Sequence, residues 1–387
     1  MRILLVAPQP FYTERGTPIA VRLLAQTLCD EGHRVDLLTY HLGQDIAHPN
    51  LTLVRCAAVP GIRDVPIGIS VKKLLCDVSL SLRMARMLWT SRYDVVHAVE
   101  ESLFPAVLLT LFSRRRLVYD MDSLLSEQVA DKWRALRPLS AMLGAIERAA
   151  IRRCDCVLAV CEDLAVKVRA CIPGERVVVL PDVPMPRARV AADVEQLRLH
   201  TRGGETLLLY VGNLERYQGM DLMLQALQRV TATHVYKLIV IGGERSHVEQ
   251  YTAAASELGL AERVVFLGPR PLAALGDYLD QADVLVSPRT LGQNTPMKIY
   301  SYMQAGKAIL ATRIRSHTQV LDDSCALLTE PTPAALAAGV ERLLADPGLR
   351  SSFGSRALQR VESEFSLAEF QRKLRGAYAR LAAPSET

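Results

Sequence analysis

Short apolar runs alternate with longer segments of helical periodicity along almost the whole chain. This alternation is typical of a parallel β-sheet, because each parallel strand needs a crossover segment, usually a helix, before the next strand. In the first half it predicts strands near residues 2–7, 34–39, 51–55, 94–98, 116–121, 155–159 and 176–180. In the second half it predicts strands near residues 206–211, 235–241, 262–267, 283–286, 308–311 and 325–328. The predicted fold class is therefore α/β.

The alternation is interrupted at residues 181–186, where the sequence Pro-Asp-Val-Pro-Met-Pro allows neither a helix nor a β ladder to continue. The chain of 387 residues is also longer than one hydrophobic core supports, since cores stop growing at about 250 to 300 residues. We therefore expect two doubly wound, Rossmann-like domains facing across a cleft, with the boundary at residues 182–183. In such sheets, ligands bind beyond the carboxyl ends of the strands.

Composition excludes several classes of protein. Half of the residues are apolar, and 22 glycines and 20 prolines are spread along the chain, which excludes disordered, collagen-like and coiled-coil proteins. Basic residues are scattered and only 5% of the chain is aromatic, so we expect no binding of nucleic acid. The longest apolar run, Leu103–Phe112, is far below the roughly 20 residues that a membrane span needs. We expect a cytoplasmic protein whose eight cysteines are buried free thiols.

The net charge of +5 is confined to the first half of the chain. Residues 1–192 contain 25 Lys and Arg against 20 Asp and Glu, whereas the remaining residues contain 21 of each. An anionic surface or acceptor facing the first domain would explain this asymmetry. Drift in base composition would also explain it, because the chain is rich in arginine and poor in lysine.

Two loops that follow predicted strands have features of anion-binding sites. In the first, Gly16 allows a close approach of backbone N–H groups, and Thr17 and Pro18 are expected to begin a helix, although an ordinary βα turn explains this loop as well. In the second, Thr295 is expected to cap a helix with Pro296 at its first position, between the cations Arg289 and Lys298. Backbone donors, helix dipole and two cations would together form a cradle for a diphosphate; the alternative is a capped helix with incidental charges.

Several motifs in order resemble the family 4 retaining glycosyltransferases of the GT-B fold, and the resemblance spans nearly the whole chain. They are Gly212-Asn213-Leu214, Gln218-Gly219-Met220-Asp221, Ile241-Gly242-Gly243-Glu244 and the segment Pro296–Lys307. The segment Ser366–Tyr378 resembles the helix that crosses back to the first domain in that family, so about 366–387 is assigned to that domain. The resemblance implies an enzyme that needs no metal or cofactor. Residues 183–365 would bind a nucleotide sugar, expected to be UDP-linked, and residues 1–182 would present a glycan, lipid-linked or small-molecule acceptor.

The chain also departs from that family pattern. Asn213 and Gln218 replace an arginine and a lysine that bind the donor diphosphate, and Gln293 and Ser301 replace two glutamates. Asp122 stands where a histidine is frequent. Two hypotheses remain: an active transferase in which the cations have moved to other positions, which we favour because the replacements are polar, or an inactive homologue that acts as a binding or partner subunit.

The predicted site residues follow from these loops and from the resemblance. Lys298, Arg289 and Asp122 are the catalytic candidates, and His97, Glu100 and Glu101 at the end of a strand are candidates on the acceptor side. One of the two glutamates would equally serve as a first-turn helix charge. No metal ligands are predicted, although Asp120 and Asp122 could hold Mg²⁺ as a pair. The donor-binding candidates are Gly16, Gly212, Asn213, Arg216, Gly243, Glu244, Gln293, Asn294, Thr295, Pro296, Met297 and Ser301.

The segment Ser70–Trp89 has helical periodicity with a basic side. We interpret the apolar stripe as the face buried in the core; it comprises Val71, Leu74, Leu75, Val78, Leu82, Ala85 and Trp89. The basic side, with Lys72, Lys73, Arg83 and Arg86, would then face solvent. The alternative is that these residues and Arg114-Arg115-Arg116 bind an anionic membrane, as in a peripheral enzyme on its inner face that uses lipid-linked acceptors.

Overall fold

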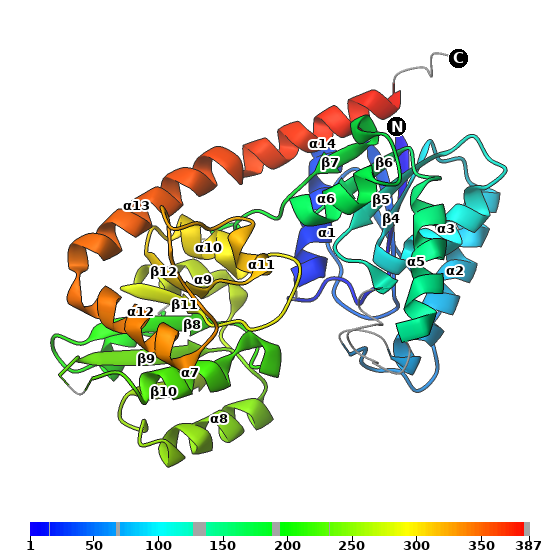
Figure 1. Cartoon of the computed structure of the whole chain (residues 1–387). Helices are drawn as coiled ribbons and strands as arrows, with labels where there is room; N and C mark the ends of the chain where they lie inside the picture. The colour runs from blue at the N-terminus through cyan, green and yellow to red at the C-terminus, as the bar shows by residue number, and fades with distance from the viewer. Residues whose placement is uncertain (15, 67–69, 127–136, 188–193, 232, 383–387) are drawn as a thin grey trace. The chain divides into compact units, whose positions relative to one another are not determined.

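The computed structural model describes residues 1–14, 16–66, 70–126, 137–187, 194–231 and 233–382 (Figure 1). The contacts divide the chain into two compact units, one made of Met1–Pro181 with Phe370–Thr387 and the other of Asp182–Glu369. Each unit is built around one parallel sheet with helices on its faces, which confirms the predicted fold class of two doubly wound domains.

The sheet of the first unit has seven strands in the order β3-β2-β1-β4-β5-β6-β7. The observed bounds of these strands lie within about one residue of the predicted ones, because strands buried on both faces are nearly continuous apolar runs. Their bounds are β1 Arg2–Ala7, β2 Arg34–Thr39, β3 Leu51–Arg55, β4 Val95–Val99, β5 Arg116–Met121, β6 Cys156–Ala159 and β7 Val177–Val179. From β1 the sheet extends through β2 and β3 on one side, and from β4 it extends through β5, β6 and β7 on the other. The loops after β1 and β4 therefore lie at the topological switch point, where ligands commonly bind.

One helix of the first unit, α2, begins at a residue whose side chain caps it. Ser70 accepts a hydrogen bond from the Lys73 backbone N–H at the start of α2. The helices are α1 Gly16–Asp30, α2 Val71–Thr90, α3 Leu103–Thr110, α5 Arg137–Ile151, α6 Glu162–Arg169 and the end of α14 Leu367–Ala382, with the 3-10 turns η1 Glu100–Ser102 and η3 Gly174–Arg176. In Figure 1, α2, α3 and α5 lie side by side in this unit, and α3 contacts both of the others.

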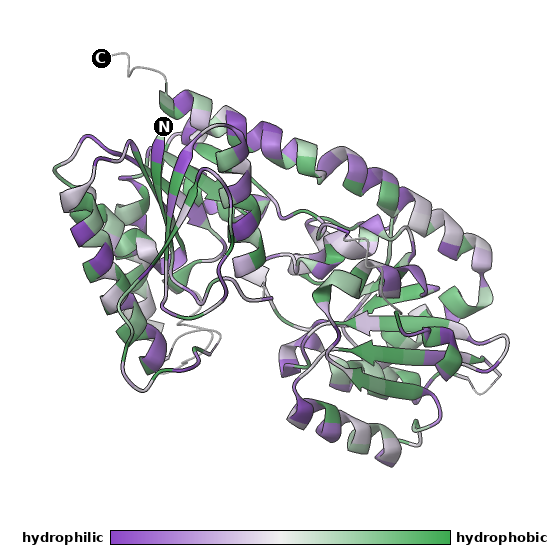
Figure 2. Cartoon of the chain, turned by 180° about the vertical axis from the view of Figure 1, so that it is seen from behind, coloured by the Kyte–Doolittle hydropathy of each residue, from purple (hydrophilic) through white to green (hydrophobic). Residues whose placement is uncertain are grey.

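The sheet of the second unit has six strands in the order β10-β9-β8-β11-β12-β13, with apolar clusters on both faces. Its strands are drawn almost wholly in green, the hydrophobic colour, in Figure 2. The strands are β8 Thr206–Val211, β9 Tyr236–Ile241, β10 Val264–Gly268, β11 Val284–Ser287, β12 Ala308–Thr312 and β13 Leu327–Thr329. The helices are α7 Met220–Leu227, α8 Arg245–Glu257, α9 Leu275–Asp280, α10 Lys298–Gln304, α11 Arg315–Thr318, α12 Pro333–Ala345 and α13 Pro347–Glu364, with the 3-10 turns η4 Leu197–His200, η5 Arg216–Gln218 and η6 Leu272–Ala274.

The predicted orientation of α2 is wrong. The stripe that we assigned to the core is exposed, with Trp89 92% and Val71 75% accessible. The opposite side of the helix is buried instead, through Cys76, Leu80, Met84, Met87 and Leu88. Both sides carry apolar residues at helical spacing, so periodicity alone could not select between them. The helix therefore presents an apolar face to solvent.

Both predicted helix starts are also wrong in position. Helix α1 begins at Gly16, so Thr17 and Pro18 lie within its first turn, where the missing N–H of proline has no cost. Helix α10 begins at Lys298, because a tight turn, closed by the Ile299 N–H on the Pro296 carbonyl, precedes it. All eight cysteines are free and seven are buried, as predicted. Residues 383–387 of the predicted C-terminal helix lie outside the described residues.

Candidate functional site

Glycines close the carboxyl ends of β8 and β9 in the second unit. Gly212 follows β8 and donates its N–H to the Ile241 carbonyl at 3.0 Å, and Gly242 follows β9 with a φ of 110°. A Cβ at Gly242 would lie 2.2 Å from the Gly212 carbonyl oxygen, so no larger residue fits between the two loops. Backbone rather than side chains therefore forms this edge of the sheet, which is the feature that a ligand approaching closely requires.

The amino group of Lys298 lies beside this edge. Its Nζ donates to Oε1 of Gln218 at 3.1 Å and lies 4.1 Å from the centre of the Tyr210 ring. A Cβ at Gly212 would be 3.4 Å from the same Nζ. The Tyr210 hydroxyl donates to the Asn213 carbonyl at 2.6 Å, which fixes the ring against the loop after β8. Burial lowers the pKa of Lys298 well below its usual value, and the charge of Arg289 lowers it further.

Arg289 is a second cation near this edge; it is buried and organises the loop after β11. It is 8% exposed, its Nε donates to the Leu291 carbonyl at 2.6 Å, and one Nη donates to the Asn294 carbonyl at 3.3 Å. The guanidinium carbon lies 5.3 Å from the centre of the Tyr217 ring. Gly292 has a φ of 135°, and a Cβ there would collide with the guanidinium. The loop is therefore folded around Arg289, whose pKa is lowered by burial.

Neither cation has an acidic partner. Within the described ranges, no carboxylate forms an ion pair with Arg289 or Lys298. Burying a positive charge without a counter-ion is disfavoured, and the pKa values of both groups are lowered accordingly. The arrangement is suited to binding an anion, and it can stabilise negative charge that develops on a leaving group.

A buried histidine supports the Arg289 loop from behind. His317 is fully buried; its Nε2 lies 3.0 Å from the Ser287 hydroxyl and its Nδ1 lies 2.8 Å from the Thr312 carbonyl. The Thr312 hydroxyl in turn donates to the Arg289 carbonyl. Burial, followed by the charges of Lys298 and Arg289, lowers the pKa of His317 to about 4. The ring is therefore neutral at pH 7 and adds no third charge.

The buried His317 should make the stability of the second unit depend on pH. Its pKa is 6.5 in the unfolded chain and about 4 in the folded one, so between these values only the unfolded chain gains a proton. The free energy of unfolding should therefore decrease as the pH is lowered, by roughly 2 kcal/mol between pH 6.5 and pH 5. We expect the stability advantage of the parent over His317→Gln to shrink by this amount in urea unfolding at pH 6.5 and 5. An advantage that stays constant across these pH values would contradict the buried neutral ring.

The other predicted donor-binding residues differ in how much of their surface is exposed to solvent. Asn213, Arg216, Glu244 and Gln293 are exposed, and Asn294, Pro296 and Met297 are partly buried. The Thr295 hydroxyl is buried and has no hydrogen-bond partner among the described residues, so it is not the predicted helix cap. Ser301 is 4% exposed and accepts a hydrogen bond from the Met185 N–H at 3.2 Å. Gly243 packs against Leu214, whereas Gly16 is in the first unit, at the exposed start of α1.

The first unit has a cluster of acidic side chains after β4 and β5. Glu100 and Glu101 follow β4, and Asp122 follows β5. Nζ of Lys73, from α2, lies 2.6 Å from Glu101 and 3.8 Å from Glu100. Burial, together with the charge of Glu101, raises the pKa of Glu100 to about 8, and Asp122 contributes to the rise. Glu100 therefore retains its proton near neutral pH and can donate a hydrogen bond.

Asp77 and Tyr40 extend this cluster along α2. The Tyr40 hydroxyl donates to the Asp77 carboxylate, and burial raises the pKa of Asp77 to about 7. Glu100 has a φ of 49°, in the left-handed region that non-glycine residues rarely adopt. Such conformations concentrate at functional sites because the surrounding structure has to enforce them. The cluster has the polar groups to bind and orient hydroxyl groups.

His97 does not belong to this cluster, and its prediction as the end of a strand is wrong. It lies in the middle of β4, is fully buried, and its Nδ1 is 2.7 Å from the Tyr378 hydroxyl on α14. Burial lowers its pKa to about 3, and its Nε2 lies 3.9 Å from Asp120. The side chain therefore points toward the docked C-terminal helix, away from Glu100 and Glu101.

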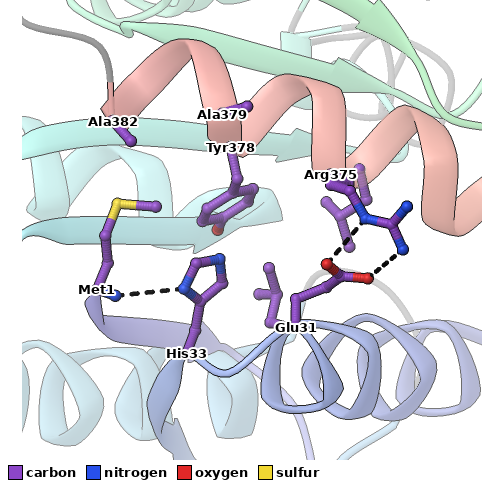
Figure 3. A pocket seen from close by; sticks show the side chains of 9 residues that line it. Met1, Glu31, His33, Arg375, Tyr378, Ala379 and Ala382 are labelled. Atoms are coloured by element: carbon purple, nitrogen blue, oxygen red, sulfur yellow. Dashed lines mark hydrogen bonds and ion pairs between the residues drawn. The ribbon is translucent and has the colours of Figure 1, made fainter.

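A pocket of about 170 Å³ lies where α14 docks on the first unit (Figure 3). His33 stands between the amino terminus of Met1 and Tyr378, and Arg375 pairs with Glu31 at its rim. Met1 and His33 precede β1 and β2, so the pocket opens at the amino ends of these strands. It is thus at the opposite end of the sheet from the acidic cluster.

Sequence reasoning missed several residues of these sites. No role in a site was predicted for Tyr210, His317, Tyr40, Asp77 or Glu147. Glu147 is 2% exposed, and its carboxylate accepts from Leu125 N–H at 2.9 Å and from the Ser126 hydroxyl at 2.7 Å, which holds the loop after β5. A lone glutamate on the apolar side of a predicted helix was the available signal. In the part of the chain that is described, no three His, Cys, Asp or Glu side chains gather as metal ligands.

Comparisons with known proteins give a consistent result. Residues 15–182 match a family described as glycosyl transferase 4-like domain, and residues 205–346 match one described as glycosyl transferases group 1. A phosphatidyl-myo-inositol mannosyltransferase of Mycolicibacterium smegmatis is 26% identical over 368 residues, which cover 93% of this chain and 89% of that protein. The fold is similar to that of a sucrose-phosphate synthase from Thermosynechococcus elongatus (TM-score 0.79, 21% identity, 98% of both chains) and of HepE from Anabaena in complex with UDP (TM-score 0.74, 16% identity, 98% of this chain and 100% of that one).

Proposed function

Because the chain belongs to the family 4 glycosyltransferases of the GT-B fold, we propose that it transfers a sugar from a nucleoside diphosphate donor to a lipid-linked acceptor with retention at the anomeric carbon. The observation that carries this proposal is the pair of cations, the buried Arg289 and the partly buried Lys298, which lack any acidic partner within the described residues. A donor diphosphate would supply the missing negative charge. UDP is the nucleotide proposed, since structures of similar fold include complexes with UDP.

The role of the cations follows from the chemistry of the leaving group. When the bond to the sugar breaks, negative charge builds up on the diphosphate oxygens, and preorganised positive groups stabilise that charge. Lys298 is proposed as the direct contact, while Arg289 folds the loop and adds its field. Of the positions where the family pattern has charged residues, Asn213 and Gln293 are exposed here and available to the donor's sugar or ribose hydroxyls.

The acidic cluster of the first unit is proposed as the acceptor side. Glu100 and Glu101 together with Asp122 follow neighbouring strands, and their oxygens can accept or donate hydrogen bonds to acceptor hydroxyls. Burial leaves Glu100 with a pKa of about 8, so it would act as a hydrogen-bond donor rather than as a full charge. In retaining chemistry of this type, the leaving phosphate itself is proposed to take the acceptor proton.

An apolar surface on the first unit supports a lipid-linked acceptor. Among the described residues, twelve of the seventeen exposed large hydrophobic ones lie on or next to α2, α3 and α5. They are Val71, Leu74, Leu75, Val78, Leu82, Trp89, Leu108, Leu109, Leu111, Phe112, Met142 and Ile146, and we call them the apolar face. Contiguous exposed apolar residues of this extent mark a surface that contacts a partner or a membrane.

Charge favours an anionic membrane as the partner of the apolar face. The two acidic residues of α2 and α5, Asp77 and Glu147, are directed into the unit, and α3 has none. Lys72, Arg86 and Arg114 are exposed around the apolar face. Exposed aromatic and aliphatic residues edged by basic ones are typical of helices that lie in a membrane interface. No helix among the described residues is long and apolar enough to span the bilayer.

A donor panel tests the proposed function. The purified protein is screened for thermal stabilisation by UDP-, GDP- and ADP-sugars, since a ligand at 100 times its dissociation constant stabilises by about 2.7 kcal/mol. The stabilising donor is then incubated with phospholipid acceptors, and the product's anomeric configuration is determined by NMR. Transfer with inversion would contradict the retaining mechanism, and donor binding without transfer to any acceptor would favour the inactive alternative.

Activity is expected to survive chelation. Arg289 and Lys298 are proposed to neutralise the donor diphosphate, so no divalent cation is needed for that role. Sugar transfer is measured in EDTA and after addition of excess Mg²⁺, and equal rates are expected. If EDTA abolished transfer and Mg²⁺ restored it, the proposed metal independence would be wrong. Asp120 and Asp122 would then be the candidate ligands of the metal.

A further inference from the structure

The amino group of Lys298 is held by two uncharged partners. The Gln218 amide oxygen accepts its hydrogen bond at 3.1 Å, and the Tyr210 ring lies against it at 4.1 Å. Both partners are buried, Gln218 to 7% exposure and Tyr210 completely. A carboxylate would have stabilised a partly buried ammonium group better, so the presence of an amide and a ring at this position needs an explanation.

Resting on the donor site proposed above, we propose that Gln218 and Tyr210 are positioning residues that hold the Lys298 amino group, without a counter-ion, in place for a phosphate group of the donor. The amide oxygen fixes the direction of the amine but cancels none of its charge. The face of the ring attracts an ammonium group without competing for its remaining N–H bonds. A carboxylate at position 218 would satisfy the amine and compete with the phosphate.

The remaining groups near Lys298 agree with this assignment. Arg289 is a cation, His317 is neutral at pH 7, and burial raises the pKa of Tyr210 well above its usual value, so none of these neighbours supplies negative charge. Without an anion, the amine binds its proton weakly because burial and Arg289 disfavour the charge. A bound phosphate reverses this preference. Donor binding should therefore raise the pKa of Lys298, and above the pKa of the free protein's amine it should be accompanied by uptake of a proton.

Calorimetric titration with UDP tests the assignment. Titrations of the parent at several pH values from 7 upward, in buffers of different ionisation enthalpy, should reveal proton uptake on binding. Gln218→Glu gives Lys298 a charged partner, so it should abolish the uptake and weaken UDP binding by at least about tenfold, the loss expected for a charge-assisted hydrogen bond. Gln218→Met removes the amide without adding a charge, and it should weaken binding while the uptake persists.

Tyr210 and a control lysine complete the test. Tyr210→Leu removes the ring face and should weaken UDP binding. Tyr210→Phe keeps the ring and should bind UDP nearly as tightly as the parent. Lys237 is the matched control, because its amino group also donates to a carbonyl, that of Glu262, but it is buried at the amino end of β9. Lys237→Met should change neither UDP affinity nor proton uptake.

The outcomes separate this inference from the function on which it rests. If the parent binds UDP, and Gln218→Glu and Gln218→Met bind it with parental affinity and proton uptake, the positioning role is wrong while the donor site stands. If the parent binds none of UDP, GDP and ADP, the proposed donor site is wrong and the positioning role is lost with it.

Discussion

Replacing Lys298 by methionine is expected to lower kcat/KM for sugar transfer by a factor of about 10² to 10³. This corresponds to about 2.7 to 4 kcal/mol of transition-state stabilisation, the loss seen when a preorganised donor to a developing oxyanion is removed. Lys298 has no acidic partner in the described part of the chain, so its removal leaves no unpaired buried carboxylate. The variant should therefore fold, which urea unfolding of both proteins will check.

Lys237→Met is the matched control for this experiment. It removes another lysine of the same unit, one that is buried at the opposite end of the sheet, and should retain parental turnover. Parental turnover by Lys298→Met itself would show that the diphosphate assignment is wrong. Arg289→Met is a less specific test, because Arg289 also holds the carbonyls of Leu291 and Asn294, and its loss should disorder the loop.

The sheets were predictable because strands buried on both faces leave a strong pattern. The run Val284–Val286, for instance, is fully apolar and is flanked by Asp283 and Ser287, so its position follows from composition alone. The order of the strands was not predicted, since it depends on how β8 pairs with both β9 and β11. Yet this order brings Gln218 to Lys298, eighty residues apart in sequence. The sequence could identify Lys298 as a cation after a strand but not its partners.

Two errors had physical causes that no single-sequence pattern resolves. In β4 every residue is buried, so alternation could not tell that His97 points toward Tyr378, which lies 281 residues later in the chain. In α2, both sides of the helix are apolar, and the buried side also carries Lys73 and Asp77, which made it look like the solvent-facing side. The polar residues on that side face the interior of the unit because Lys73 pairs with Glu101 of the acidic cluster after β4.

The exposed side of α2 leads to the second large effect, on membrane binding. The double variant Trp89→Ser, Phe112→Ser is expected to bind anionic vesicles at least about 100-fold more weakly than the parent. Trp89 and Phe112 are the most exposed members of the apolar face, at 92% and 98%, and burying each large apolar side chain contributes about 1.5 to 3 kcal/mol. Binding is measured by co-sedimentation with phosphatidylglycerol vesicles at low salt.

The matched control is Leu199→Ser, Val235→Ser, which removes two exposed apolar residues from the second unit and should leave vesicle binding unchanged. Lys73 is omitted from the charge variants, since it pairs with Glu101; Arg86→Gln and Arg114→Gln should each weaken binding by about 1 kcal/mol, an effect that salt removes. The aromatic variant should keep its affinity for UDP, because Arg289 and Lys298 lie in the other unit. If the parent binds anionic and neutral vesicles equally weakly at low salt, the apolar face does not bind membranes and a water-soluble acceptor is the better hypothesis.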